Sequence, residues 1–335
     1  MEISDIQRYD SEKMYETYDY WPKLAKEYYE KDFSKLEIND IDHIVFAGMG
    51  GSGTIGDIIS SILSKTNIHV NVVKGYLLPK TVDSNTLVVA TSISGNTDEV
   101  VSILKNSEKS KARFISFSSD GNLEKLSLKN NIKYVKIPQS HSPRASLPSF
   151  LYSILNVLEN IIPIKKNDII ESISKLEQTQ KLISSSNLNE KNPSLSLANW
   201  MKNIPVIYYP WGLQAAAIRF KNSLQENAKI HTISEDMIEA CHNGVVAWEN
   251  KTSVQPILIQ GHDDYIKTKE RWKIFKEFLQ SKQIDFKEVN SGKGNILSKI
   301  MYLIYLLDYS TIYHAIESKI DPTPVKPIEF IKSRI

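Results

Sequence analysis

The sequence predicts an α/β protein of two similar halves, each a doubly wound, mainly parallel sheet flanked by helices. Short apolar runs of strand length alternate with amphipathic helical stretches, which is typical of parallel sheets. This alternation pauses at a weak break around residues 160–168 and then starts again. A chain of 335 residues is long for one domain and sufficient for two. We expect the halves to span residues 1–160 and 161–335.

The first half begins with helices, because residues 1 to about 35 show a helical pattern rich in aromatic side chains. Apolar runs follow, and the run at 86–91 lacks polar alternation, which indicates a strand buried on both faces. The predicted strands are 43–47, 69–73, 86–91, 113–117 and 134–137, with helices at 55–63 and 97–104.

The second half opens with a long helix at 169–184 and then repeats the alternation. A helix at 213–224 follows the first strand, and a helical tail is expected at the C-terminal end. The predicted strands are 206–209, 229–232, 254–259 and 285–289.

Composition indicates an ordinary globular protein, with 41% apolar and 24% charged residues. Its single cysteine, Cys241, excludes an intramolecular disulfide and fits a reducing compartment. The net charge of +2 comes from 41 basic and 39 acidic residues, which argues against nucleic acid or an anionic membrane as a partner. Neither a bilayer-spanning run nor a signal-peptide pattern is present, so we expect a soluble cytoplasmic protein.

A glycine-rich loop, Gly48-Met49-Gly50-Gly51-Ser52-Gly53, lies between a predicted strand and a predicted helix. Bare backbone N–H groups at the start of a helix can bind an anion such as phosphate. The loop also matches the dinucleotide pattern G-x-G-x-x-G. The second strand, however, runs into Val73-Lys74-Gly75, without the carboxylate that would hold a ribose. This absence disfavours NAD, and NADP less strongly.

A second loop, Thr91-Ser92-Ile93-Ser94-Gly95-Asn96-Thr97, also follows a strand and opens a helix. Serine and threonine often do no more than cap a helix there. Two such loops at the carboxyl ends of adjacent parallel strands favour a phosphate site instead, because ligands bind there. The expected phosphate-binding residues are Gly50, Gly51, Ser52, Ser92, Ser94 and Thr97.

The second loop resembles the phosphosugar-binding loop of sugar isomerase (SIS) domains. The chain as a whole resembles the archaeal-type bifunctional phosphoglucose/phosphomannose isomerases, through both halves and the C-terminal stretch 321–325. Besides the two loops, the specific segments are Pro143-Arg144-Ala145, Glu226-Asn227 and His242-Asn243.

The resemblance implies two SIS subdomains and an aldose–ketose isomerase that acts through a cis-enediolate. Its substrates would be hexose 6-phosphates. It would interconvert glucose 6-phosphate, and mannose 6-phosphate as well, with fructose 6-phosphate. It also implies a homodimer, no metal or other cofactor, and a role in glycolysis and gluconeogenesis.

Such an enzyme needs a base over C2, a cation beside the developing oxyanion, and groups that open the sugar ring. By resemblance, Glu226 is the base and Arg144 the cation. His242, reaching in from the neighbouring subunit, opens the ring together with Lys332. Lys319 and Lys326 are rivals of Lys332. Each of these side chains has an ordinary alternative as a solvated surface or loop residue.

The seven histidines show no paired spacing typical of zinc ligands, so we expect no metal site. Two other function classes stay open. A non-catalytic SIS-type regulator would keep the second loop, residues 91–97 (the hydroxyl loop), but would need neither Glu226 nor His242. It would usually also carry a DNA-binding domain. An NADP-dependent oxidoreductase would use the glycine loop and would not require the hydroxyl loop.

Overall fold

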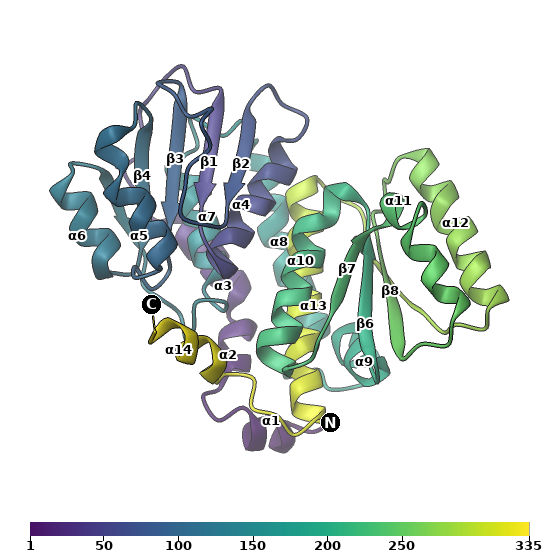
Figure 1. The fold of residues 1–335 in the computed structure, drawn as a ribbon. Coiled ribbons are helices and arrows are strands. Elements are labelled where there is room, and N and C mark those ends of the chain that lie inside the picture. The colour runs from purple at the N-terminus through teal and green to yellow at the C-terminus, as the bar shows by residue number, and fades with distance from the viewer. Residues whose placement is uncertain (335) are drawn as a thin grey trace. The chain divides into compact units, whose positions relative to one another are not determined.

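The computed structural model describes residues 1–334, which form two compact units (Figure 1). One comprises Tyr20–Ser174 and contains a five-stranded sheet (the five-stranded unit). The other combines Met1–Asp19 with the chain from Lys175 onward and contains a four-stranded sheet (the four-stranded unit). Helix α8 (Lys166–Ile183) carries the chain from one sheet to the next.

The first sheet consists of β1 (His43–Ala47), β2 (His69–Val73), β3 (Thr86–Thr91), β4 (Arg113–Ser118) and β5 (Lys133–Lys136). All strand pairs are parallel, in the order β2-β1-β3-β4-β5. Because β2 and β3 lie on opposite sides of β1, the direction of winding reverses at β1. In open α/β sheets, ligands bind outside the carboxyl ends of the strands at such a reversal.

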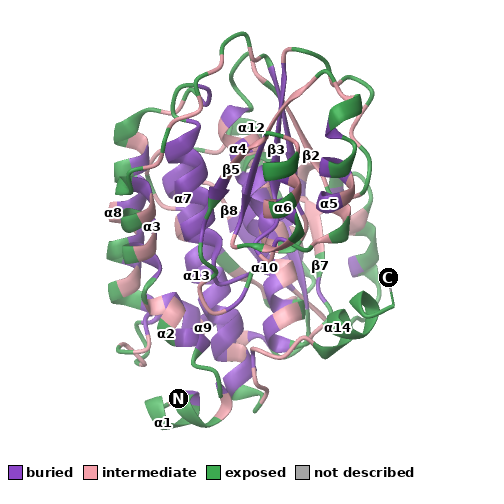
Figure 2. Cartoon of the chain, turned by 90° about the vertical axis from the view of Figure 1, so that its left-hand side faces the viewer, coloured by how far each residue is buried: buried purple, intermediate pink, exposed green. Residues whose placement is uncertain are grey.

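The helices of this unit are α3 (Trp21–Glu30), α4 (Gly50–Leu63), α5 (Asp98–Lys105), α6 (Gly121–Lys129) and α7 (Leu147–Val157). Every residue of β1 and β3 is buried, which explains why the run at 86–91 does not alternate with polar residues. Val45 and Val88 pack against Ile103 of α5. Every residue of α7 is buried as well, and Figure 2 shows buried residues along both β3 and α7.

The second sheet consists of β6 (Ile204–Tyr209), β7 (Ile233–Asp236), β8 (Val254–Gln260) and β9 (Lys287–Asn290). It is also fully parallel, in the order β7-β6-β8-β9, so the predicted α/β class with two parallel sheets is confirmed. The predicted strand at 229–232 is wrong, because the strand begins four residues later. Lys229 adopts a left-handed conformation with φ 59° that ends the preceding helix, and extended pairing starts only at Ile233.

The helices of the four-stranded unit are α1 (Ile3–Tyr9), α2 (Met14–Asp19), α9 (Pro193–Trp200), α10 (Gln214–Ser223), α11 (Met237–Ala240), α12 (Ile266–Ser281), α13 (Ile296–Glu317) and α14 (Lys326–Lys332). Hydrogen bonds tie the N-terminal helices to α13. The Tyr305 hydroxyl donates to the Tyr18 carbonyl at 2.7 Å, and the Tyr309 hydroxyl to the Asp19 carboxylate at 2.7 Å. Residues 1–19 therefore complete the packing around α13.

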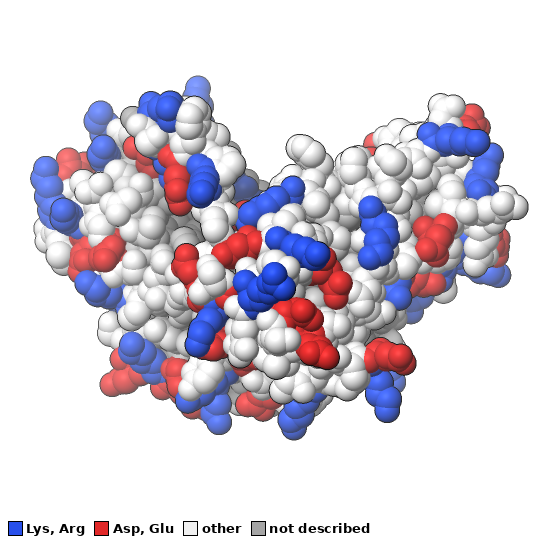
Figure 3. Space-filling model, turned by 90° about the horizontal axis from the view of Figure 1, so that it is seen from below, with Lys and Arg blue, Asp and Glu red and all other residues white. Residues whose placement is uncertain are grey.

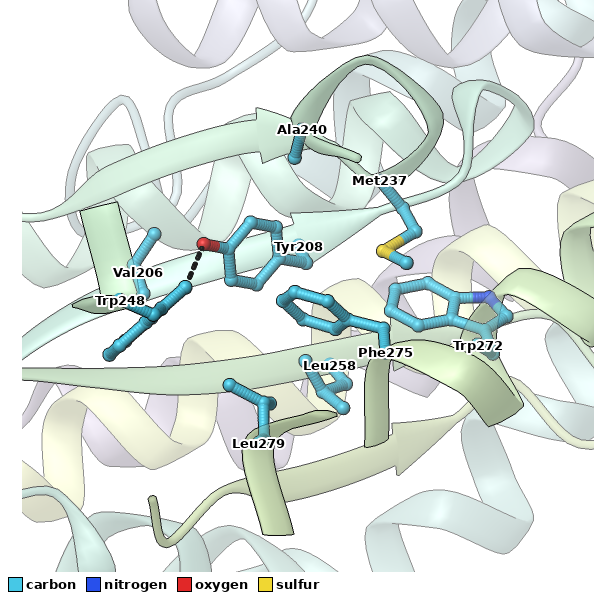
Figure 4. Close-up of a cluster of buried hydrophobic side chains, with 9 residues drawn as sticks. All are labelled: Val206, Tyr208, Met237, Ala240, Trp248, Leu258, Trp272, Phe275 and Leu279. Carbon is cyan, nitrogen blue, oxygen red and sulfur yellow. Dashed lines mark hydrogen bonds between the residues drawn. The ribbon is translucent and has the colours of Figure 1, made fainter. Parts of the chain in front are cut away.

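An aromatic cluster fills the side of the second sheet that faces α11 and α12 (Figure 4). Tyr208 and Phe275 meet edge to face, with ring centroids 4.9 Å apart. The Trp248 indole N–H donates to the Tyr208 hydroxyl at 3.0 Å. Burial raises the pKa of Tyr208 to about 12, so this hydroxyl stays neutral and serves packing.

The molecular surface carries both signs of charge. Lysine and arginine side chains are interspersed with aspartate and glutamate on the face drawn in Figure 3, as the balanced composition predicts. Within residues 1–334, none of the helices combines the length and the hydropathy needed to cross a bilayer.

Candidate active site

The glycine loop follows β1, and its last four residues form the first turn of α4, which begins at Gly50 rather than at the predicted residue 55. The shape of this segment requires glycine. Gly50 has φ +51°, in the left-handed region that side chains rarely adopt. A Cβ on Gly53 would lie 2.8 Å from the Gly48 carbonyl oxygen, so the chain turns too tightly there for a side chain. The first amides of α4, those of Gly50 and Gly51, have no preceding helical carbonyl to bond. These N–H groups are suited to hold an anion.

The hydroxyl loop joins β3 to α5, and a hydrogen bond closes it. The Ser92 and Thr97 hydroxyl oxygens lie 2.8 Å apart, and the Thr97 N–H also bonds to the Ser92 oxygen at 3.3 Å. Ser92 is buried, whereas Ser94 and Thr97 are partly exposed. The buried Ser92 therefore holds the loop in place, and the hydroxyls of Ser94 and Thr97 lie at the N-terminus of α5.

Residues of the next loop, after β4, brace the hydroxyl loop. Gly95 has φ +70°, and a Cβ there would lie 1.6 Å from the Asp120 carbonyl oxygen. The Asn96 side chain accepts a hydrogen bond from the Asn122 N–H at 3.0 Å. Asn96, Asp120 and Asn122 were not singled out from sequence. The turn residues Asp120-Gly121 at the end of a strand were the available signal.

The two loops lie at the same edge of one sheet. β1 and β3 are hydrogen-bonded neighbours, with Ala47 opposite Ala90, so the segments that follow them emerge side by side. This edge is the point at which the strand order reverses. The structure thus brings the six expected phosphate-binding residues together on one unit.

Lys74, directly after β2, borders the glycine loop. Its Cε lies 3.1 Å from the position that a Cβ on Gly53 would occupy, and its ammonium pairs with Asp57 of α4 at 2.6 Å. Burial raises the pKa of Asp57, and the Lys74 charge opposes that shift. The cation that a 2′-phosphate of NADP would need here is therefore already paired.

Arg144 lies between β5 and α7 and is only 4% exposed, so it is not a surface arginine. The turn that carries it is held by the buried Ser146. This hydroxyl accepts from the Ser140 N–H at 2.8 Å and lies 2.9 Å from the Ser142 carbonyl oxygen. A guanidinium fixed in a protein interior is suited to stabilise a developing negative charge.

Glu226 lies in the four-stranded unit, in a π-helical turn (η3, Leu224–Ala228) that continues α10. It is partly buried rather than fully solvated. The neighbouring Asn227 is buried, and its side-chain amide donates to the Thr311 hydroxyl of α13 at 2.8 Å. The carboxylate is therefore carried by backbone that is anchored in the core.

His242 and Lys332 also belong to the four-stranded unit, and both are exposed in the single chain. His242 is in the turn after α11, where its N–H donates to the Glu239 carbonyl at 2.8 Å. Lys332 ends α14, a helix with no buried residue. Arg144 and the two loops thus belong to one unit, and Glu226, His242 and Lys332 to the other.

A cavity of about 530 Å³ lies away from these residues. Its lining residues, among them Asn203, Gln255 and Asp285, precede or begin β6, β8 and β9. The cavity is therefore at the amino ends of these strands, the edge opposite to the one where ligands bind in such sheets. In residues 1–334, no group of three His, Cys, Asp or Glu side chains is placed to hold a metal ion.

Comparison with known proteins agrees with this arrangement. Residues 37–150 match the SIS domain, and residues 190–335 match the bacterial phospho-glucose isomerase C-terminal SIS domain. A glucose-6-phosphate isomerase like protein from Thermus thermophilus has the same fold, with TM-score 0.63, 15% identity and 99% of each chain covered. The fold and its paired loops define a protein of two SIS domains.

The sequence relatives are more specific. The bifunctional phosphoglucose/phosphomannose isomerase of Caldicellulosiruptor bescii is 30% identical over 96% of this chain and 98% of its own length. The enzyme of the same name from Thermoplasma volcanium is 31% identical over 90% of this chain and 93% of its own. The chain belongs to the bifunctional phosphoglucose/phosphomannose isomerase family, as the resemblance predicted.

Proposed function

We propose that this protein interconverts fructose 6-phosphate with glucose 6-phosphate and mannose 6-phosphate, without a metal ion. The observation that carries the proposal is that the glycine loop and the hydroxyl loop follow neighbouring strands, β1 and β3, in a chain that matches this family over nearly its whole length. An NADP-dependent oxidoreductase would not need the hydroxyl loop, and the Lys74–Asp57 pair further disfavours it. The family and its single-cysteine, charge-balanced composition support a cytoplasmic location.

The phosphate is bound by backbone amides and hydroxyls. Gly50, Gly51 and Ser52 supply amides from the first turn of α4. Ser94 and Thr97 supply hydroxyls just before α5, and the buried Ser92 supports them. Helix N-termini add a favourable dipole, so the site needs no lysine or arginine of its own. This leaves the sugar carbons for residues outside the loops.

Proton transfer is assigned to Glu226. With fructose 6-phosphate, the carboxylate removes a proton from C1, and the C–H electron pair forms the C1=C2 double bond of a cis-enediolate. Arg144 stabilises the charge that collects on oxygen. The hydroxyl proton on O1 then passes to O2, and the glutamic acid returns its proton to C2 as the C1 carbonyl forms. C2 is planar in the enediolate, so protonation of one face gives glucose 6-phosphate and of the other gives mannose 6-phosphate.

Ring opening is assigned to His242 and Lys332 in a homodimer. A neutral imidazole can accept the proton of the anomeric hydroxyl and an ammonium can donate one to the ring oxygen. The exposure of both side chains in the single chain supports a role outside that chain's own core. We place His242 in the active site of the partner copy.

Subunit mixing tests this exchange of His242. Glu226→Gln and His242→Ala are each expected to be inactive as homodimers. Co-refolded in equal amounts, they should regain about one quarter of the wild-type activity, because half of the dimers are mixed and each has one intact site. No recovery in dimers shown by native mass spectrometry to be mixed would place His242 in its own chain's site.

The direct test of the function is an assay on fructose 6-phosphate with excess EDTA, in which NMR resolves the products. We expect both glucose 6-phosphate and mannose 6-phosphate. Glucose 6-phosphate alone would restrict the protein to phosphoglucose isomerase activity. Binding of fructose 6-phosphate without any product would favour the alternative of a non-catalytic SIS-type regulator.

A further inference from the structure

The helix that carries Glu226 changes its winding at that residue. α10 ends at Ser223, and the next five residues form the π-helical turn η3, closed by a bond from the Lys229 N–H to the Leu224 carbonyl. A π turn adds one residue to a helix, which rotates the side chains that follow by about 100°. The direction of the Glu226 carboxylate therefore depends on this turn. Isolated π turns are uncommon and occur frequently at functional sites.

One buried turn of α13 anchors η3 on both sides of Glu226. The Ser223 hydroxyl donates to the Asp308 carboxylate at 2.6 Å, just before η3. The Asn227 amide donates to the Thr311 hydroxyl at 2.8 Å, just after Glu226. Thr311 in turn donates to the Asp308 carbonyl at 2.7 Å. Asp308 and Thr311 are 0% exposed, so water does not compete for these bonds.

The same carboxylate holds α10 one turn earlier. Arg219 donates to Asp308 through Nε at 2.9 Å and through Nη2 at 2.6 Å, and the Tyr18 hydroxyl donates to it at 3.2 Å. Burial would lower the pKa of Arg219, but the neighbouring Asp308, Tyr18 and Glu226 outweigh it and raise that pKa. A buried ion pair contributes little net stability compared with apolar packing. Here Arg219 of α10 and Tyr18 of α2 donate to the same carboxylate of α13. This geometry is suited to fixing the positions of α10 and α2 along α13.

We propose that the Asp308–Thr311 turn of α13 is the positioning element for the catalytic base: it fixes η3 in its π-helical form and so directs Glu226 at the sugar. This inference rests on the proposed function of Glu226. Asp308, Thr311 and Ser223 are positioning residues, because they act through the backbone of η3. The anchors should therefore affect the proton-transfer step more than substrate binding, which the loops of the other unit supply.

The test is Thr311→Val, which keeps the side-chain shape and removes the acceptor for Asn227. We expect kcat to fall about 10- to 100-fold with KM for fructose 6-phosphate within about twofold, as for a displaced catalytic group. Exchange of the C1 proton with solvent deuterium, followed by NMR, should slow by the same factor. Thr311→Ser, which restores the hydroxyl, should recover most of the rate.

Ser194→Ala is the matched control. It also removes a buried hydroxyl hydrogen bond to α13, from Ser194 to the Leu306 carbonyl at 2.7 Å, but on the side of α9. A merely structural role would lower the thermal midpoint in both variants and leave kcat per folded molecule unchanged in both. The positioning role predicts a loss of kcat in Thr311→Val alone.

Glu226→Gln, measured in parallel, separates this inference from the function beneath it. If Glu226→Gln is inactive while Thr311→Val keeps its kcat and its exchange rate, the positioning role of Thr311 is wrong. The assignment of Glu226 as the base is then retained. If Glu226→Gln is active, the base itself is wrong. Should Thr311→Val fail to fold, Ser223→Ala removes the other anchor and must show the same loss of kcat.

Discussion

Glu226→Gln is expected to lower kcat by about 10²- to 10⁴-fold, the usual contribution of a general base. Glutamine keeps the size of the side chain and its hydrogen-bonding capacity, but it cannot accept the C1 proton. Fructose 6-phosphate should still bind with nearly unchanged affinity, because the phosphate loops belong to the other unit. Steady-state kinetics and calorimetric titration with fructose 6-phosphate measure the two effects separately.

The control for this variant is Glu277→Gln, an exposed glutamate on α12 in the same unit, which should retain full activity. Turnover near the wild-type value in Glu226→Gln, with binding intact, would mean that another group removes the proton. Loss of binding together with turnover would instead indicate that Glu226 holds the substrate.

Gly95→Ala is expected to remove most of the phosphate affinity. A Cβ would lie 1.6 Å from the Asp120 carbonyl oxygen, and φ +70° is unfavourable for alanine, so the hydroxyl loop must move. Hydrogen bonds to a charged group contribute about 1.5–3 kcal/mol each, so loss of two raises KM about 100-fold or more. Measurement of KM and of the free energy of unfolding distinguishes lost binding from lost folding.

Gly75→Ala is the matched control in the same unit, because a Cβ there meets no atom within 4 Å and the backbone φ is not in the positive range. Its KM should stay within about twofold of the wild-type value. A Gly95→Ala protein that kept its KM as well would contradict the assignment of this loop to the phosphate.

The strands were predictable where burial is local to the chain. The run at 86–91 is apolar throughout, and the structure places all of it in the interior. β7 was misplaced because three of its four residues, Ser-Glu-Asp, are polar, and none of the four is buried at this edge of the sheet. Nothing in its own composition distinguishes it from a loop. Pairing with β6, a tertiary interaction, makes it a strand.

The candidate site divides in the same way. The glycine and hydroxyl loops were found because their residue types and their position after a strand are local features. The anchors of η3 were missed because Asp308 and Thr311 are more than 80 residues away from Ser223 and Asn227 in the chain. A signal did exist: Asp308 interrupts the long apolar stretch of α13, in which the only other carboxylate is the terminal Glu317.

The grouping of residues 1–19 with the chain after residue 175 has a consequence for synthesis on the ribosome. The five-stranded unit is continuous and can fold as soon as it has emerged. The four-stranded unit needs Tyr18 and Asp19, made at the outset, to meet Tyr305 and Tyr309, made almost last. During most of translation, α1 and α2 therefore cannot yet make their contacts with α13. A fragment starting at residue 175 would emerge with these tyrosines uncovered, and we expect it to aggregate unless residues 1–19 are supplied as a separate peptide.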